Sequence, residues 1–168
     1  GGEILYEPFA RRWAVGTTIN SLKQRGFEKN FELLDYQTVT GYVSLYFASP
    51  WYNFDFAVHA GRYLAKDTGA TFEARRTFDN GFSIGGFFTR TDVPAEVFGE
   101  GSFDKGLFFK IPFNGLFPGN SKNALALILR PLERDGGRRL EDFSGSLWFL
   151  RRQVRYDALS NNLSRMIP

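Results

Sequence analysis

Apolar and polar side chains alternate along most of this chain with a period of two residues, which is the period of a β-strand with one apolar face. Residues 13–20 read WAVGTTIN, so that Trp13, Val15 and Ile19 share one side while small or polar residues occupy the other. The same alternation recurs in residues 35–48, 54–63, 69–78 and 82–91. We therefore expect a succession of strands that each have one apolar face.

Turn sequences separate these segments. The Asp-Asn-Gly sequence at residues 79–81 predicts a hairpin, because Asn-Gly suits backbone positions with positive φ. Further strands are expected at residues 1–9, 107–113, 124–131 and 141–150. Helical periodicity is weak outside residues 153–166. Strands that follow one another without helical crossovers predict an all-β, antiparallel, up-and-down protein of about eight strands. We expect these strands in residues 1–149, and a polar C-terminal tail or terminal element in residues 150–168.

The residue types on the polar side of the strands distinguish a membrane barrel from a soluble one. In the strand centres this side carries Thr, Ser, Gly, Asn and Tyr, which suit the lumen of a membrane barrel better than a water-exposed face. Aromatic residues make up 17% of the chain, and several lie near expected strand ends, as in the aromatic belts of membrane proteins. These are Trp13, Phe47, Phe54, Phe78, Phe82, Phe113 and Trp148. The pattern favours a transmembrane β-barrel, with a soluble ligand-binding barrel as an alternative.

Composition argues against several other classes of protein. The chain has no cysteine, which excludes disulfide frameworks, thiolate metal sites and cysteine nucleophiles. The net charge is +3 and the arginines are dispersed in pairs, so that no nucleic-acid partner is expected. No apolar run reaches the roughly 18 residues of a membrane helix.

Two features could carry catalysis. His59 is the only histidine, and it lies on the polar side of its segment without a Ser or Asp signature close by in the sequence. Glu96, Glu100 and Asp104 form an acidic cluster that could supply the two carboxyl groups of a glycosidase. The glycines around them would hold a general acid poorly, and Asp104-Lys105 is interpreted as a turn pair. We predict no enzyme, no cofactor and no metal site. The alternative is a small outer-membrane barrel enzyme that acts on lipid or glycan with His59 and a loop carboxylate.

The polar side of the strands also carries residues that could line a path for a polar polymer. Tyrosine rings can stack on sugar faces while their hydroxyl groups form hydrogen bonds, although the same residues could merely fill a barrel interior. The candidate lumen-lining residues are Tyr36, Tyr42, Tyr46, His59, Glu73, Arg75 and Lys110. Paired charges such as Glu73 and Arg75 would tune passage or anchor an internal plug.

Three stretches of sequence resemble a known family. They are GRYLAKDTGATFEARRTFDNGFSIGGFFTRTDV (61–93), FGEGSFDKGLFFKIPF (98–113) and LRPLERDGGRRL (129–140). These stretches resemble the C-terminal part of the YjbH/GfcD family, and residues 6–47 are similar in pattern. Members of that family are Gram-negative outer-membrane β-barrel proteins associated with the export of exopolysaccharide and group 4 capsule.

The resemblance implies a location in the bacterial outer membrane and a part in polysaccharide secretion. Because family members are several times longer, it also implies that this chain is a piece of a larger barrel, completed by other segments or chains. The implied partners are outer-membrane lipid, the polysaccharide and other proteins of the export system. The family offers no catalytic residues that could be assigned to positions of this sequence.

Overall fold

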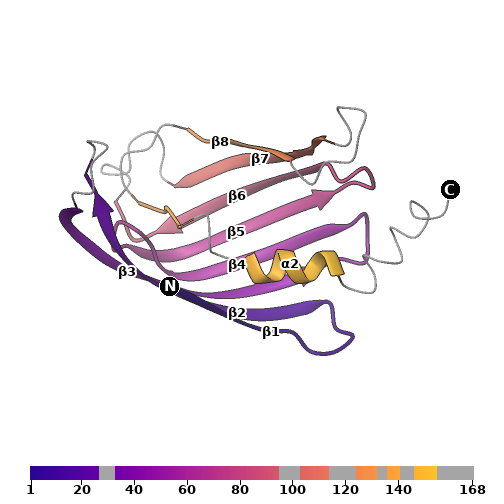
Figure 1. Ribbon diagram of the computed structural model, residues 1–168, viewed down its shortest axis with the longest axis horizontal. Coiled ribbons are helices and arrows are strands. Elements are labelled where there is room, and N and C mark those ends of the chain that lie inside the picture. Colours follow the sequence, from indigo (N-terminus) through magenta and orange to yellow (C-terminus); the bar gives the residue numbers. More distant parts are fainter. Residues whose placement is uncertain (27–32, 95–102, 114–123, 132–135, 141–145, 155–168) are drawn as a thin grey trace.

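The chain folds into one antiparallel sheet with a helix on one of its faces (Figure 1). The computed structural model describes residues 1–26, 33–94, 103–113, 124–131, 136–140 and 146–154. The elements are β1 (Gly2–Tyr6), β2 (Trp13–Arg25), β3 (Leu33–Ala48), β4 (Phe54–Arg62), β5 (Thr68–Thr77), β6 (Ser83–Thr91), β7 (Asp104–Pro112), β8 (Ala124–Leu129) and α2 (Ser146–Val154).

Each strand pairs with the next strand along the chain, so that the order in the sheet is β1 to β8. Every pairing is antiparallel. The predicted up-and-down topology of eight strands is therefore confirmed. The sheet is open within the described residues, because β1 and β8 are its two edge strands and do not pair with each other.

The hairpin predicted at Asp79-Asn80-Gly81 joins β5 to β6. The Gly81 amide donates to the Phe78 carbonyl at 2.8 Å, and the Asn80 side chain accepts from the Phe82 amide at 3.0 Å. Gly81 has φ +83°, a backbone conformation that glycine adopts at no steric cost. The turn sequence thus fixes the register in which β5 meets β6, with Thr77 opposite Ser83.

The burial of the two faces of the sheet is the reverse of that in a soluble protein: the polar face is buried and the apolar face is exposed. Along β3 the polar positions Thr40 and Ser44 are 0% and 2% exposed, whereas Val43 and Leu45 are 57% and 52% exposed. We call the buried polar side the covered face and the other side the apolar face. The alternation predicted from the sequence is confirmed, and it buries the polar residues.

The segment at residues 141–150 was expected to be a strand, and this prediction is wrong for its described part. Residues 146–150 belong to helix α2, which lies across the covered face (Figure 1). A short apolar run such as SLWFL fits a buried strand or a buried helix equally well, so that tertiary contacts decide between them. Trp148 therefore lies on this helix and not at a strand end.

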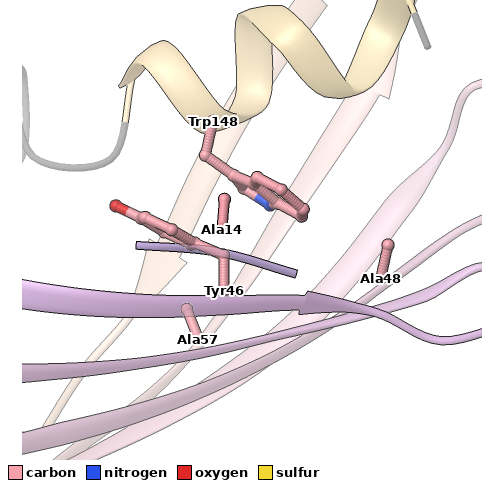
Figure 2. Packing of buried hydrophobic residues seen from close by; sticks show 5 residues of the cluster. All are labelled: Ala14, Tyr46, Ala48, Ala57 and Trp148. Atoms are coloured by element: carbon pink, nitrogen blue, oxygen red, sulfur yellow. The ribbon is translucent and has the colours of Figure 1, made fainter. Parts of the chain in front are cut away.

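A small apolar cluster joins α2 to the sheet. Trp148 is fully buried, and its ring is stacked on that of Tyr46 with a centroid distance of 5.2 Å and an interplanar angle of 11° (Figure 2). Ala14, Ala48 and Ala57 complete the cluster, and their small side chains leave room for the two large rings (Figure 2). Alanines at these positions let the helix approach the strands closely.

The other aromatic residues that were expected at strand ends gather at one end of the sheet. Even-numbered strands begin at this end and odd-numbered strands finish there, as the antiparallel order requires. The residues are Trp13, Phe47, Phe54, Phe78, Phe82 and Phe113. We call this the aromatic end. The opposite end carries the basic side chains of the apolar face, and we call it the basic end; these side chains are Lys23, Arg25, Arg62, Arg90 and Lys105.

Candidate functional site

The covered face is the candidate site, because polar and charged side chains converge there beneath the segment formed by residues 136–140 and α2. Glu73 of β5 lies at its centre and is nearly buried. Its Oε1 atom accepts from Arg75 at 3.0 Å, and its Oε2 atom accepts from Arg139 at 3.3 Å. The Glu73 carboxylate thus links Arg75 of the same strand to Arg139. We call residues 136–140 and α2 together the covering segment.

Helix α2 carries a second ion pair. Arg152 donates from Nε to Asp55 at 2.8 Å and from Nη2 to the Asn53 side chain at 2.8 Å. Both charged side chains are almost fully buried, so that the pair is little screened by solvent. Two arginines in the last turn of α2 also complement the negative end of the helix dipole.

The loop between β4 and β5 holds residues 136–140 in place. The Gly137 amide donates to the buried Asp67 carboxylate at 2.7 Å, and the Leu64 amide donates to the Arg138 carbonyl at 3.0 Å. A Cβ atom at Gly137 would lie 3.0 Å from the Cβ of Asp104, and its φ is +70°. Close approach and backbone conformation both require glycine at this position.

Beside Glu73 lies a cavity of about 290 Å³ with an excess of positive charge. Among the described residues that line it, four are cations, namely Arg75, Lys110, Arg130 and Arg139, and one, Glu73, is a carboxylate. Asp104 binds Arg130 at 2.9 Å from just outside.

Aromatic rings form part of the wall of this basic cavity. The Arg75 guanidinium lies over the Phe149 ring at 3.8 Å and over the Phe108 ring at 4.8 Å from their centroids. Within the described part of the chain, Arg75 Nε and Arg139 Nη1 are buried donors without a hydrogen-bond partner. Buried donors of this kind, next to a cavity, can bind an anionic group such as a carboxylate.

A second cavity of about 310 Å³ lies at the β1 side of the same face. Glu3, Thr18 and Asn20 line it together with Leu140 and Leu147. The Leu147 amide donates to Glu3 at 3.3 Å, which ties the start of α2 to the edge strand. The covering segment therefore leaves space on both sides of its central contacts.

The structure brings six of the seven predicted lumen residues onto the covered face. Glu73, Arg75 and Lys110 line the basic cavity together. Tyr42, Tyr46 and His59 are buried beneath the covering segment, at 2%, 0% and 2% exposure. Tyr36 is separate from them: it is exposed near the β4–β5 loop, where its hydroxyl donates to the Leu64 carbonyl at 2.6 Å.

His59 has a partner that is distant in the sequence. Ser44 Oγ lies 2.8 Å from His59 Nδ1, across the β3–β4 ladder. Both residues are buried, so the hydrogen bond satisfies two polar groups that no solvent reaches. Strand register could have revealed this pair, since residues 15 apart face each other across the hairpin.

A polar ladder continues from His59 toward the basic end. Tyr63 follows β4, and its hydroxyl lies 2.6 Å from Thr71 Oγ1, which lies 2.7 Å from Thr89 Oγ1. Burial raises the pKa of Tyr63, so that its hydroxyl stays protonated.

Asp104 was interpreted as a turn residue, and this interpretation is wrong. Asp104 begins β7, is 1% exposed and forms an ion pair with Arg130. Glu96 and Glu100, the other members of the acidic cluster, lie outside the described residues. The Asp104 side chain therefore lies on the covered face, and the residue does not belong to an exposed loop.

Sequence reasoning missed the residues that come from the covering segment. Arg139, Phe149 and Arg152 contact strand residues that lie 66 to 97 positions away along the chain. A visible signal was the basic pair in each of the stretches GGRRL and LRRQ. Among the described residues, no group of three His, Cys, Asp or Glu side chains could hold a metal ion. No helix within the described ranges is long and apolar enough to cross a membrane.

Comparison with known proteins agrees with the resemblance seen in the sequence. The model of the family described as "Exopolysaccharide biosynthesis protein YbjH" matches residues 1–150. A relative from Escherichia coli (strain K12), named "Uncharacterized lipoprotein YjbH", is 37% identical over 145 residues. That match covers 83% of this chain and 21% of the relative, so the chain spans about one fifth of the relative's length. No solved structure matches the chain significantly. The chain belongs to the YjbH family of exopolysaccharide biosynthesis proteins.

Proposed function

We propose that this chain is part of the wall of an outer-membrane β-barrel that takes part in exopolysaccharide export. The reversed burial of the sheet is the observation that carries the proposal. In soluble sheet proteins a helix covers the apolar face, whereas α2 covers the polar face and leaves residues such as Val43 exposed. An exposed apolar sheet face opposite a polar interior is the arrangement of a membrane barrel.

Charge is distributed along the apolar face as a bilayer would require. No described position of this face carries a charge between Arg76 near the aromatic end and the side chains of the basic end. On β2 the uncharged stretch runs from Trp13 to Ser21, about nine residues, close to the length of a tilted membrane strand. The face therefore has an apolar band of suitable height.

The aromatic end resembles a membrane interface. Trp51 and Tyr52 in the β3–β4 turn are 71% and 76% exposed, and Trp13 begins β2 next to them in the sheet. The Arg76 guanidinium stacks on the Phe78 ring at 4.4 Å, which keeps its charge at the edge of the band. Tryptophan, tyrosine and arginine are the residues that anchor proteins at the lipid headgroups.

The open sheet fits a barrel that is completed from outside this chain. Among the described strands, β1 and β8 present unpaired edges, which strands of a closed barrel would cover. The relative from E. coli is about five times longer than the matched region, and its name includes the word lipoprotein, in keeping with the cell envelope. We propose that further strands, from a longer chain or from a partner, pair with both edges.

The covered face would then line the lumen, with the covering segment as an internal plug. The basic cavity beside Glu73 suits an acidic polymer, because the cations among its described lining residues exceed the carboxylates and the rings of Phe108 and Phe149 form part of its wall. Residues 136–140 and α2 would hold the path closed until the ion pairs to Glu73 and Asp55 are exchanged.

Membrane insertion can be tested with single-tryptophan variants in vesicles of brominated phosphatidylcholine. One variant keeps Trp13 on the apolar face, and its matched control keeps Trp148, which is buried between α2 and the sheet; phenylalanine replaces the other tryptophans. We expect bromine on the acyl chains to quench Trp13 and to leave Trp148 bright. Equal quenching of the two residues, or a chain that folds in buffer without lipid or detergent, would contradict the proposal.

A role in export can be tested in the full-length protein that contains this segment. Lys110→Glu introduces an acidic group into the basic cavity and should lower the amount of secreted polymer. Lys23→Glu makes the same charge change on the other face and should leave secretion unchanged. Equal secretion by the two variants would show that the cavity does not contact the polymer.

The alternative is an enzyme that uses the Ser44–His59 pair. Burial of both side chains favours a structural role, so that His59→Ala should destabilise the fold without a specific loss of export by the protein that still folds. Complete loss of activity in a normally folded His59→Ala protein would favour the enzyme instead.

A further inference from the structure

A shallow groove of about 640 Å³ crosses the apolar face over β5 to β8. Its walls are the side chains of Phe72, Phe88, Leu107 and Leu129, and its floor is formed by the small residues Ala74 and Gly86. Phe72 and Phe88 pack against each other at a centroid distance of 5.4 Å. The groove is thus a depression with apolar walls on the face that the proposed function places in lipid.

The basic end of this groove carries cations. Lys105 lines the groove directly and pairs with Phe88 across the β6–β7 ladder. Arg90 is the next apolar-face position on β6, and Arg62 lies farther along the same edge at the end of β4. All three side chains are exposed, and none of them belongs to an ion pair between described residues, although the Lys105 ammonium lies over the Phe103 ring at 5.0 Å.

The two described carboxylates that adjoin these cations along the chain, Asp104 and Asp92, have other partners, and Asp104 binds Arg130 at 2.9 Å. Asp92 follows β6, and both of its oxygens accept hydrogen bonds from Thr68, at 2.9 Å from the amide and 2.8 Å from the hydroxyl. Cations that have no carboxylate partner among the described residues, at one end of an apolar groove, complement a molecule with one anionic end and a long apolar part.

We propose that this groove binds a membrane lipid with an anionic headgroup, its acyl chain over Phe72 and Leu107 and its phosphate between Lys105 and Arg90. The inference rests on the proposed function, because the site is reached only from within a bilayer. It adds a defined position for one lipid to the general contact between the apolar face and the membrane. An arginine can form two parallel hydrogen bonds with a phosphate, and lysine adds a mobile charge.

The test uses the full-length protein that contains this segment, in dodecyl maltoside micelles, and native mass spectrometry to count bound lipids. The probes are phosphatidylglycerol and phosphatidylcholine with identical acyl chains, so that they share the phosphate and differ in net charge. We expect the wild-type chain to retain phosphatidylglycerol in preference to phosphatidylcholine. Lys105→Gln and Arg90→Gln should each lower that retention roughly fivefold. Lys23→Gln removes a cation from the same end of β2, far from the groove, and should have no effect.

A second pair of variants tests the acyl-chain part of the site. Ala74→Leu fills the floor of the groove and should reduce the retention of both lipids, whereas Ala60→Leu adds the same bulk on β4 outside the groove. Equal retention of the two probes, or an equal loss with Lys23→Gln, would overturn the proposal. A chain that retains no lipid and dimerises would also overturn it and would make a second copy the occupant. Quenching of Trp13 by brominated lipid would persist in each case if only the lipid site were wrong.

Discussion

The two faces of this sheet are covered in different ways by material of opposite character. The covered face is polar and is closed from within the chain by α2 and residues 136–140, mainly through ion pairs. The apolar face has no covering element among the described residues, and Val43, Leu45 and Ile19 are each more than half exposed. In most soluble folds the burial of apolar side chains is the largest favourable contribution to the free energy of folding. On this face of the sheet, that burial has to come from a surrounding phase.

The difference shows which interactions hold each side. On the covered face a few buried charges and one aromatic stack, Tyr46 with Trp148, hold the helix against the strands. On the apolar face no single contact matters greatly, because the total apolar area determines transfer into lipid. A substitution on the covered face should therefore lower stability strongly when it removes one of these contacts. On the apolar face the loss of stability should depend on how deep the substituted side chain lies in the bilayer.

The largest effect is expected from Arg152→Ala, which removes the cation that binds Asp55 beneath α2. The Asp55 carboxylate is 5% exposed, and removing one partner of a buried pair costs about 3–5 kcal/mol. The free energy of unfolding, measured by urea titration in vesicles with Trp148 fluorescence as the local reporter, should fall by that amount.

The neighbouring arginine provides the control. Arg151 is 60% exposed and lies 3.5 Å from Glu7, so Arg151→Ala should change stability by at most about 1 kcal/mol. If the two alanine variants lost equal stability, the covered face would not depend on its buried charges, and the comparison between the faces would fail.

A smaller effect is expected from a charge at the centre of the apolar face. Val43 lies opposite Thr17 on β2 and Ala60 on β4, in the middle of the uncharged band. A lysine at the midplane of a bilayer costs about 2–4 kcal/mol, so that Val43→Lys should weaken folding into vesicles by this amount.

Ser21→Lys places the same charge on the same face near Lys23, at the edge of the band. Here the cost should be about 0–1 kcal/mol, because the side chain reaches the headgroups. Urea titrations in vesicles measure both variants. A face exposed to water would respond equally at Val43 and Ser21, and equal values would therefore show that no bilayer covers it.

Much of the fold could be predicted from the sequence, because the alternation of apolar and polar residues within a strand reflects the environments of its two faces. Alternation in residues 13–20 and 35–48 identified the two faces, and the Asp-Asn-Gly turn fixed the register of one hairpin. The helix at Ser146–Val154 was missed, because a short apolar run fits a helix or a strand equally well and only its contacts with the sheet decide between them.

The candidate site was predicted only where it lies on strands. The positions of Glu73, Arg75 and Lys110 on the polar side place them together once the strands pair. Arg139 and Phe149 come from the covering segment, and only the folded chain brings them to Glu73 and Arg75. Long-range contacts of this kind depend on loop closure, which no local sequence pattern determines.

The smallest effect is expected at Asp92, an exposed carboxylate where β6 ends at the basic end. Hydrogen bonds from the amide and hydroxyl of Thr68 lower the pKa of Asp92, because they favour its charged form. Since the pKa is lower in the folded state than in the unfolded state, the interaction stabilises the fold above the unfolded pKa. That stabilisation is lost as the pH falls through the folded pKa. Thr68→Val removes the hydroxyl bond and should raise the pKa of Asp92 toward its ordinary value, as measured by NMR titration. An unchanged pKa of Asp92 in the Thr68→Val protein would show that the Thr68 hydroxyl does not hold the carboxylate.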